Sequence, residues 1–220
     1  MRYEPSRDGA PRRFEVTAVV LCGGASRRMG TDKAKLELDG RWLIERPLAA
    51  AREVAERVLL ACGSEPRYPE LGLECVLDGF RDAQGSVGPL AGLLAGLEAA
   101  RTPWVVALAC DLPLARADVL TSLLATAQTH RLDACLLELE RGTQPLLAAY
   151  RRESCSQAVR SALERGERRM VGFHEGLAVG SVAAERLGPS ALAAGVNLNT
   201  PEEWRALERS GRLDDKLFRP

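Results

Sequence analysis

The sequence predicts an α/β fold in which helices cover both faces of a mostly parallel β-sheet. Short, β-branched apolar runs alternate with stretches of helical spacing along most of the 220 residues. The runs are apolar throughout rather than at every second position, which is typical of strands buried on both faces. Glycine or proline follows several of them, where a strand would end. This pattern indicates a three-layer sandwich of helices, sheet and helices.

The first half of the chain contains four predicted strands. Residues 1–14 are polar and include two prolines, so we expect a loose tail before the first strand. The expected elements are, in order, a strand at 16–22, a helix at 43–56 whose regular part starts near Pro47, strands at 58–62 and 73–78, a helix opened by Pro89, and a strand at 104–110.

The second half continues the alternation. The expected elements are a helix at 117–128, strands at 133–139 and 145–150, a helix at 153–165, a strand at 177–184, and a final helix that begins at Pro201. A chain of this length buries one substantial core, so residues 15–210 are expected to form one domain of Rossmann-like character, followed by a polar extension at 211–220. In such sheets ligands bind at the carboxyl ends of the strands.

The composition excludes several classes of partner. Thirty basic residues balance thirty acidic ones, so the net charge gives no electrostatic basis for binding nucleic acid or an anionic membrane. No segment approaches the roughly 20 consecutive apolar residues of a membrane span. The first fifteen residues also lack the apolar core of a signal peptide. We therefore expect the protein in the cytoplasm.

The six cysteines are scattered singly along the chain, without a C-x-x-C motif. Several lie in or end apolar runs, so we expect buried free thiols rather than disulfides or zinc ligands. The two histidines, His130 and His174, are far apart and have no such partners. This reasoning argues against a histidine-based metal site and against a Ser-His-Asp site.

A glycine-rich segment at 21–36 follows the first predicted strand. Gly23 and Gly24 would let the backbone and its N–H groups approach a phosphate, and Arg28 and Lys33 could neutralise its charge. The segment has neither the G-x-x-x-x-G-K-[ST] motif nor G-x-G-x-x-G, which argues against a P-loop and a dinucleotide site. A plain tight turn is the structural alternative.

Lysine is rare in this chain, and its placement favours the phosphate hypothesis. Only three of the thirty basic residues are lysines, and two of them, Lys33 and Lys35, lie just after the glycines. A lysine presents a compact ammonium group, which suits a phosphate. Chance placement on a solvated turn is the alternative.

Two aspartates end predicted strands. Asp111, in CDLP (110–113), follows an otherwise apolar strand, where a carboxylate needs a cation or hydrogen-bond donors. Together with triphosphate oxygens and waters, it could complete a Mg²⁺ site. The structural alternative is a helix cap approached through Pro113. Asp78 offers a second carboxylate, or a contact with a ribose or base.

Six segments in order, LCGGASRRMGTDKAKL, GPLAG, CDLP, QPLLAAY, GERRM and NLNTPEE, resemble the molybdenum cofactor guanylyltransferases, from about Val16 to Trp204. The resemblance implies a Rossmann-like nucleotidyltransferase fold. It implies transfer of GMP from Mg-GTP to the terminal phosphate of molybdenum-molybdopterin, with release of pyrophosphate. It also leaves open contacts with other molybdenum cofactor synthesis proteins and with the apo-molybdoenzymes that receive the product.

The resemblance also implies roles for individual residues. Lys33 would contact the phosphates, and Asp111 would contact both GTP and Mg²⁺, so these two are the candidate catalytic residues. The other implied nucleotide contacts are Leu21, Cys22, Gly23 and Asp78. Family members often have an asparagine where this chain has Ala61, which makes GTP specificity the least secure implication. Transfer from CTP or to a sugar phosphate, and a non-catalytic nucleotide-binding protein, are the alternatives.

The candidates for the acceptor site come from three later segments: Gln144, Arg168, Arg169, Asn197 and Asn199. Gln144 is expected between two strands. The two arginines could hold the pterin phosphate or simply form a solvated helix end. The asparagines could bind the acceptor or metal, or fix the turn before the last helix.

Overall fold

The computed structural model describes residues 15–23, 32–38, 40–80, 88–198 and 203. The expected tail at 1–14, the helix expected from Pro201 and the extension at 211–220 lie outside these residues, and so do three candidate site residues, Gly24, Arg28 and Asn199. The corresponding predictions stay predictions.

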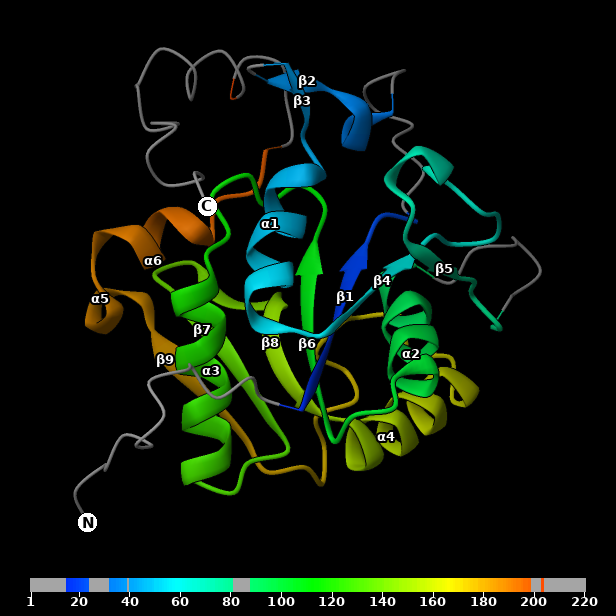
Figure 1. Ribbon diagram of the computed structural model, residues 1–220. Coiled ribbons are helices and arrows are strands. Elements are labelled where there is room, and N and C mark those ends of the chain that lie inside the picture. The colour runs from blue at the N-terminus through cyan, green and yellow to red at the C-terminus, as the bar shows by residue number, and fades with distance from the viewer. Residues whose placement is uncertain (1–14, 24–31, 39, 81–87, 199–202, 204–220) are drawn as a thin grey trace.

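A seven-stranded sheet forms the centre of the molecule, in the order β5-β4-β1-β6-β8-β7-β9 (Figure 1). β8 runs antiparallel to both of its neighbours, β6 and β7, and the other pairs are parallel. The strands are β1 (Val16–Leu21), β4 (Arg57–Ala61), β5 (Glu74–Val76), β6 (Trp104–Ala109), β7 (Ala134–Leu139), β8 (Gly142–Arg151) and β9 (Val179–Ala183). The mostly parallel sheet confirms the predicted fold class.

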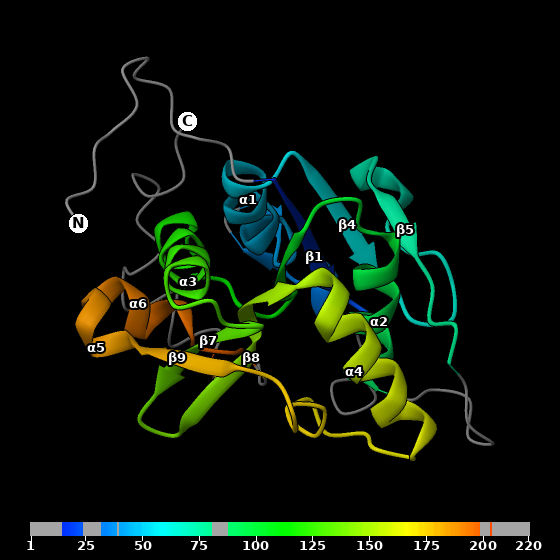
Figure 2. The same cartoon turned by 90° about the horizontal axis from the view of Figure 1, so that it is seen from below.

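Helices cover both faces of this sheet, as Figure 2 shows. α1 (Glu45–Val54) and α3 (Ala117–Thr129) pack on one face, and α2 (Pro89–Ala99) and α4 (Arg152–Glu164) on the other. Two short helices, α5 (Ala184–Leu187) and α6 (Pro189–Ala194), follow β9 and were not predicted. β1 and β6 are buried at every position, which explains why their sequences are apolar throughout.

α2 lies close against the sheet because its sequence combines leucines with glycines. Leu90, Leu93 and Leu97 have no exposed surface. A Cβ added at Gly96 would lie 2.6 Å from a methyl carbon of Val19, so the helix can approach β1 this closely only with glycine there. Pro89 occupies the first turn, where its missing N–H is not needed.

One local prediction was wrong. β8 begins at Gly142, so Gln144 lies within the strand rather than before it. The 3-10 helix η1 (Lys33–Lys35) and a two-stranded sheet of β2 (Glu37–Leu38) and β3 (Arg41–Trp42) were not predicted. None of the helices described in the structure is long and apolar enough to cross a membrane.

The expectation of free thiols was wrong for two of the six cysteines. A disulfide joins Cys62, just after β4, to Cys75, within β5, with the Cα atoms 6.1 Å apart. β4 and β5 are neighbours in the sheet, so their pairing brings together two cysteines that the sequence spacing does not connect. Cys22, Cys110, Cys135 and Cys155 are free.

Candidate functional site

The loops that follow the parallel strands are held side by side at one edge of the sheet. Hydrogen bonds of the sheet type continue past the strand ends. Cys22 N donates to Ala61 O at 2.9 Å, and Cys110 N donates to Leu21 O at 3.1 Å. Asp78 N donates to the carbonyl oxygen of Gly63 at 2.8 Å. The segments expected to carry the site therefore meet at this edge.

The order of the strands also marks a topological switch point at this edge. From β1 the chain passes to β4 and β5 on one side, and then returns through α2 to β6 on the other side of β1. Loops diverge where the direction of winding reverses, and ligands of open α/β sheets bind at such a point. The switch point, which we call the crevice, lies between the carboxyl ends of β1 and β6.

Lys33 and Asp111 meet in this crevice. Lys33 Nζ lies 2.8 Å from Asp111 Oδ2, and their side chains are 15% and 19% exposed. Lys33 begins η1, whose first turn is capped by Asp32 Oδ1 accepting a hydrogen bond from Ala34 N. Asp111 lies two residues after the end of β6. The two candidate catalytic residues, 78 positions apart in sequence, thus form a partly buried ion pair.

Side-chain amides orient the other oxygen of this carboxylate. Asn197 Nδ2 donates to Asp111 Oδ1 at 2.8 Å, and Gln144 Nε2 donates to Asn197 Oδ1 at 2.8 Å and to Gly195 O at 2.8 Å. Leu198 N also donates to the carbonyl oxygen of Asp111. Of the residues singled out for the acceptor, Asn197 therefore contacts the carboxylate itself, and Gln144 contacts Asn197. Asp111 does not cap a helix, since α3 begins only at Ala117.

The end of β1 is packed too closely for side chains at two positions. A Cβ added at Gly23 would lie 2.4 Å from Gly63 N, and Gly63 itself has φ 80°. Only glycines allow these two backbones to pass at this distance. Burial raises the pKa of the neighbouring Cys22 thiol to about 12, so this group stays protonated at neutral pH.

Asp78 and Ala61 lie beside the beginning of α2. A Cβ at Gly92 would meet Leu21, Ala61 and Asp78, with Asp78 Oδ1 3.6 Å away. Asp78 is partly buried, whereas Ala61 is 1% exposed and packs in the apolar layer below the loops. The chain has no polar side chain at position 61 to contact a base.

Arg168 and Arg169 have partners of their own in the turn after α4. Arg169 Nη2 pairs with Glu167 Oε2 at 2.9 Å, and Arg168 Nη1 donates to the carbonyl oxygen of Glu167 at 3.0 Å. Hydrogen bonds from these arginines lower the pKa of Glu167 to about 2. These contacts explain why the charged side chains cluster in the segment after α4. The role of the two arginines in binding the acceptor stays a prediction.

Three residues of the site were missed from the sequence: Asp32, Arg67 and Tyr68. Arg67 and Tyr68 both contact the Asp32 carboxylate, and Arg67 also contacts the Cys22 carbonyl. Asp32 stands next to Lys33 in the glycine-rich segment, which was a usable signal. The loop that carries Arg67 and Tyr68 has no periodicity or motif, so nothing in it pointed to these contacts.

Asp111 is the carboxylate that the sequence analysis singled out for a metal ion. Within the described part of the chain, no three His, Cys, Asp or Glu residues gather in a way that could hold one. A Mg²⁺ ion tolerates such a site, because it commonly keeps waters and takes phosphate oxygens beside one or two carboxylates. Asp111 therefore fits a metal that arrives with a triphosphate rather than a preformed protein cage.

The sheet order and the lysine–aspartate pair beside β1 define an α/β protein with a candidate phosphate site at the carboxyl ends of its strands. Residues 18–178 match the family described as the MobA-like NTP transferase domain. The chain belongs to this family.

Named relatives agree with this assignment. The chain is 34% identical over 203 residues to the "Probable molybdenum cofactor guanylyltransferase" of Trichormus variabilis, covering 91% of this chain and 93% of that protein. It is 30% identical over 196 residues to the "Molybdenum cofactor guanylyltransferase" of Shewanella sp. (strain MR-4), covering 88% and 95%. Among solved structures, "Molybdopterin-guanine dinucleotide biosynthesis protein A" from Archaeoglobus fulgidus superimposes with a TM-score of 0.74 at 26% identity, covering 88% of this chain and 97% of that one.

Proposed function

We propose that the protein transfers GMP from GTP to the terminal phosphate of molybdenum-molybdopterin, forming molybdopterin guanine dinucleotide and releasing pyrophosphate. The observation that carries this proposal is the Lys33–Asp111 pair, which lies in the β1/β6 crevice of a member of this nucleotidyltransferase family. The alignments with relatives of that name cover about nine-tenths of this chain. The cytoplasmic location expected from the sequence remains part of the proposal.

The nucleotide would lie across the loops that follow β1 and β6. The backbone of Cys22 and Gly23 approaches it at the end of β1, and Asp78 lies beside the start of α2 for a ribose or base contact. Lys33 Nζ would exchange the Asp111 carboxylate for phosphate oxygens. Because both charges are paired before the nucleotide arrives, neither is buried without a counter-charge.

Mg²⁺ is the cofactor that we propose, held by Asp111 together with triphosphate oxygens. The ion would supply positive charge to the triphosphate when it is bound. Among the described residues, each Asp111 oxygen accepts one side-chain hydrogen bond, from Lys33 or from Asn197, and a carboxylate oxygen can accept a further contact. Asn197 and Gln144 fix the orientation in which this carboxylate meets its ligand.

The proposed reaction needs positioning and charge compensation more than proton transfer. An oxygen of the acceptor phosphate attacks the α-phosphorus, a new P–O bond forms, and the bond to the β-phosphate oxygen breaks as pyrophosphate leaves. The attacking oxygen is already anionic at neutral pH, so a general base is not required. The negative charge that grows on pyrophosphate is offset by Lys33 and by backbone N–H groups of the loop.

Pyrophosphate release measures this function directly. The protein mixed with Mg-GTP and molybdenum-molybdopterin should release pyrophosphate, and the same mixture without the acceptor should not. Ala61, which has no polar group to read a base, makes CTP the alternative donor to test. Faster release or tighter calorimetric binding with Mg-CTP would reverse the choice of nucleotide. No release with either nucleotide, in Mg²⁺ or Mn²⁺, would contradict transfer.

A further inference from the structure

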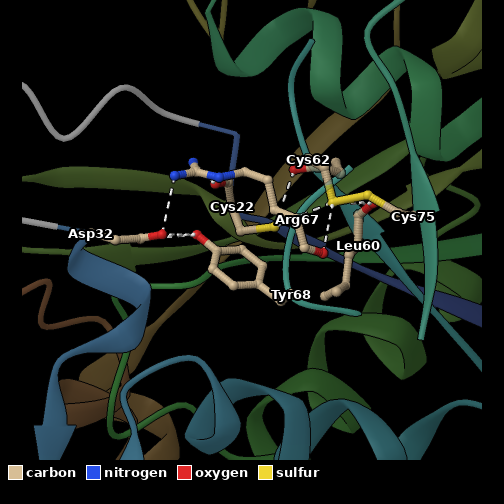
Figure 3. The surroundings of a disulfide bond; sticks show 8 residues. Cys22, Asp32, Leu60, Cys62, Arg67, Tyr68 and Cys75 are labelled. Carbon is tan, nitrogen blue, oxygen red and sulfur yellow. Dashed lines mark hydrogen bonds and ion pairs between the residues drawn. A yellow bond between two sulfur atoms is a disulfide. The ribbon is translucent and has the colours of Figure 1, made fainter. Parts of the chain in front are cut away.

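Arg67 contacts two residues of the glycine-rich segment, Cys22 and Asp32, as Figure 3 shows. Its Nη1 donates to the carbonyl oxygen of Cys22 at 3.2 Å, on the β1 side of the segment. Its Nη2 lies 3.1 Å from Asp32 Oδ2, on the other side. One planar guanidinium therefore contacts both residues, and its rigid fork limits how far apart they can move.

Tyr68 reinforces the Asp32 end of this connection. Its hydroxyl donates to the Asp32 carboxylate, with distances of 2.9 and 3.0 Å to the two oxygens. The Tyr68 residue is 3% exposed, and burial together with this hydrogen bond raises the pKa of its hydroxyl. The hydroxyl is a donor over the whole neutral pH range, so the contact does not depend on pH there.

The loop that presents these two side chains is itself tied to the sheet. The Cys62–Cys75 disulfide closes it at its base, and Cys62 Sγ lies 4.0 Å from Cys22 Sγ. A short cross-linked loop loses much of its conformational freedom. Arg67 and Tyr68 thus project from a restrained loop towards Cys22 and Asp32 (Figure 3).

Asp32 passes this restraint on to Lys33. Its Oδ1 accepts the hydrogen bond from Ala34 N that caps η1, while its carboxylate also takes the contacts from Arg67 and Tyr68. Lys33 is the first residue of the same short helix, and its ammonium group contacts the Asp111 carboxylate. A shift of Asp32 would therefore shift the residue that contacts the phosphates.

We propose that Arg67, supported by Tyr68 and Asp32, is a positioning residue that sets the place of Lys33 relative to Asp111 and the end of β1. It acts through Lys33 and the loop backbone rather than by contact with substrate. This inference deepens the proposed function and rests on it where the test uses turnover.

Arg57 provides a matched control. Like Arg67, it donates from Nη1 to a backbone carbonyl, that of Ala99 at 2.7 Å, and pairs through Nη2 with a carboxylate, Glu74. The arginine side chains are similarly exposed, at 29% for Arg57 and 33% for Arg67. Arg57 begins β4, so it lies at the opposite edge of the sheet from the crevice.

The test compares Arg67→Ala, Arg67→Lys and Arg57→Ala in the full-length protein. Arg67→Ala should lower kcat/KM for GTP by about 10- to 100-fold, mostly through kcat, because small displacements of a positioned group cost this much. Arg67→Lys should recover part of the loss, since it keeps the charge without the fork. Arg57→Ala should keep the wild-type constants. In a Lys33→Ala background, adding Arg67→Ala should change kcat/KM by less than about twofold, because residues that act as a unit are not additive.

Hydrogen exchange of the nucleotide-free protein gives a measurement that does not depend on the proposed reaction. Arg67→Ala should speed exchange of the η1 amides, including Ala34 N and Leu36 N, and Arg57→Ala should not. Unchanged exchange together with unchanged kcat would overturn the inference, even if wild-type protein transfers GMP. Additive losses in the double variant would overturn it as well. If Arg67→Ala speeds exchange but the wild-type protein does not use GTP, the inference that Arg67 restrains Lys33 still holds and the proposed function is contradicted.

Discussion

The two halves of the sheet contribute to the crevice in different ways. β5, β4, β1 and β6 are parallel, so Asp78, Cys22 and Asp111 all come after a strand has ended. β8 runs in the opposite direction, and Gln144 reaches the same edge from near the beginning of its strand. Asn197 arrives from the segment that follows α6. The residues at this edge thus come from the carboxyl ends of the parallel strands on one side and from the amino-terminal part of β8 on the other.

This difference in topology coincides with a difference in chemistry. The parallel half supplies the charged groups, Lys33 and Asp111, and the mixed half supplies uncharged amides that orient one of them. Charges that meet phosphate directly should matter more than the groups that hold them in place. We therefore expect the effects of substitution to decrease from the first half to the second.

The largest loss is expected at the ion pair itself. Lys33→Ala and Asp111→Ala should each lower kcat/KM for GMP transfer by about 10²- to 10³-fold, the usual cost of removing a group that stabilises transition-state charge. Lys35→Ala is the matched control, because Lys35 lies two residues away and pairs with the exposed Glu70. Circular dichroism should show that all three variants fold. Full activity of Lys33→Ala or of Asp111→Ala would contradict the catalytic role assigned to that residue.

Gly23→Ala tests the packing of the same half. Its new Cβ would meet backbone atoms of Gly63 and Cys62 at 2.4–2.8 Å, so the end of β1 must move. We expect a loss of about 1–3 kcal/mol in the free energy of unfolding, and weaker nucleotide binding because the loop is displaced. Gly79→Ala is the control, since a Cβ there has no neighbour within 4 Å. Equal urea midpoints for the two variants would contradict the close approach.

The strands of the parallel half could be predicted closely because burial alone sets their composition. β1 and β6 are buried at all of their positions, and the predicted boundaries differ from the observed ones by one residue. The start of β8 could not be predicted in this way. Gly142 and Thr143 are exposed, and the strand becomes buried only from Leu147, so its first residues resemble a loop. Where an antiparallel strand extends beyond the core, its exposed residues need not be apolar, so the sequence does not show where the strand begins.

The charged pair of the site could also be predicted, whereas its supports could not. A lysine after paired glycines and an aspartate at the end of an apolar strand are unusual locally. Arg67 is an ordinary arginine in an ordinary loop, and its two contacts span 35 and 45 residues. The role of Asn197 was assigned differently for the same reason, since its bond to Asp111 spans 86 residues. Contacts of this kind depend on the assembled sheet.

The amides of the mixed half should give intermediate effects. Asn197→Ala removes the donor to Asp111 Oδ1, and a hydrogen bond to a charged group contributes about 1.5–3 kcal/mol. We expect about a tenfold fall in kcat/KM for GTP, and a smaller one for Gln144→Ala, which acts one bond further away. Asn197→Asp should be worse than Asn197→Ala, because it places a second negative charge beside Asp111. Equal effects of Gln144→Ala and Asp111→Ala would break the proposed division of roles.

The smallest effect is expected at the turn after α4. Arg168 and Arg169 are exposed and engaged with Glu167, whose partners explain the cluster without a ligand. Exposed ion pairs contribute little, so the double variant Arg168→Ala, Arg169→Ala should leave kcat and the KM for GTP and for molybdenum-molybdopterin within about twofold. The KM for molybdenum-molybdopterin decides whether these arginines bind the pterin phosphate or only form a solvated charged segment. If it rises tenfold while the melting temperature and the KM for GTP stay constant, the pair binds the pterin phosphate, and the mixed half then contributes charge as well as orientation.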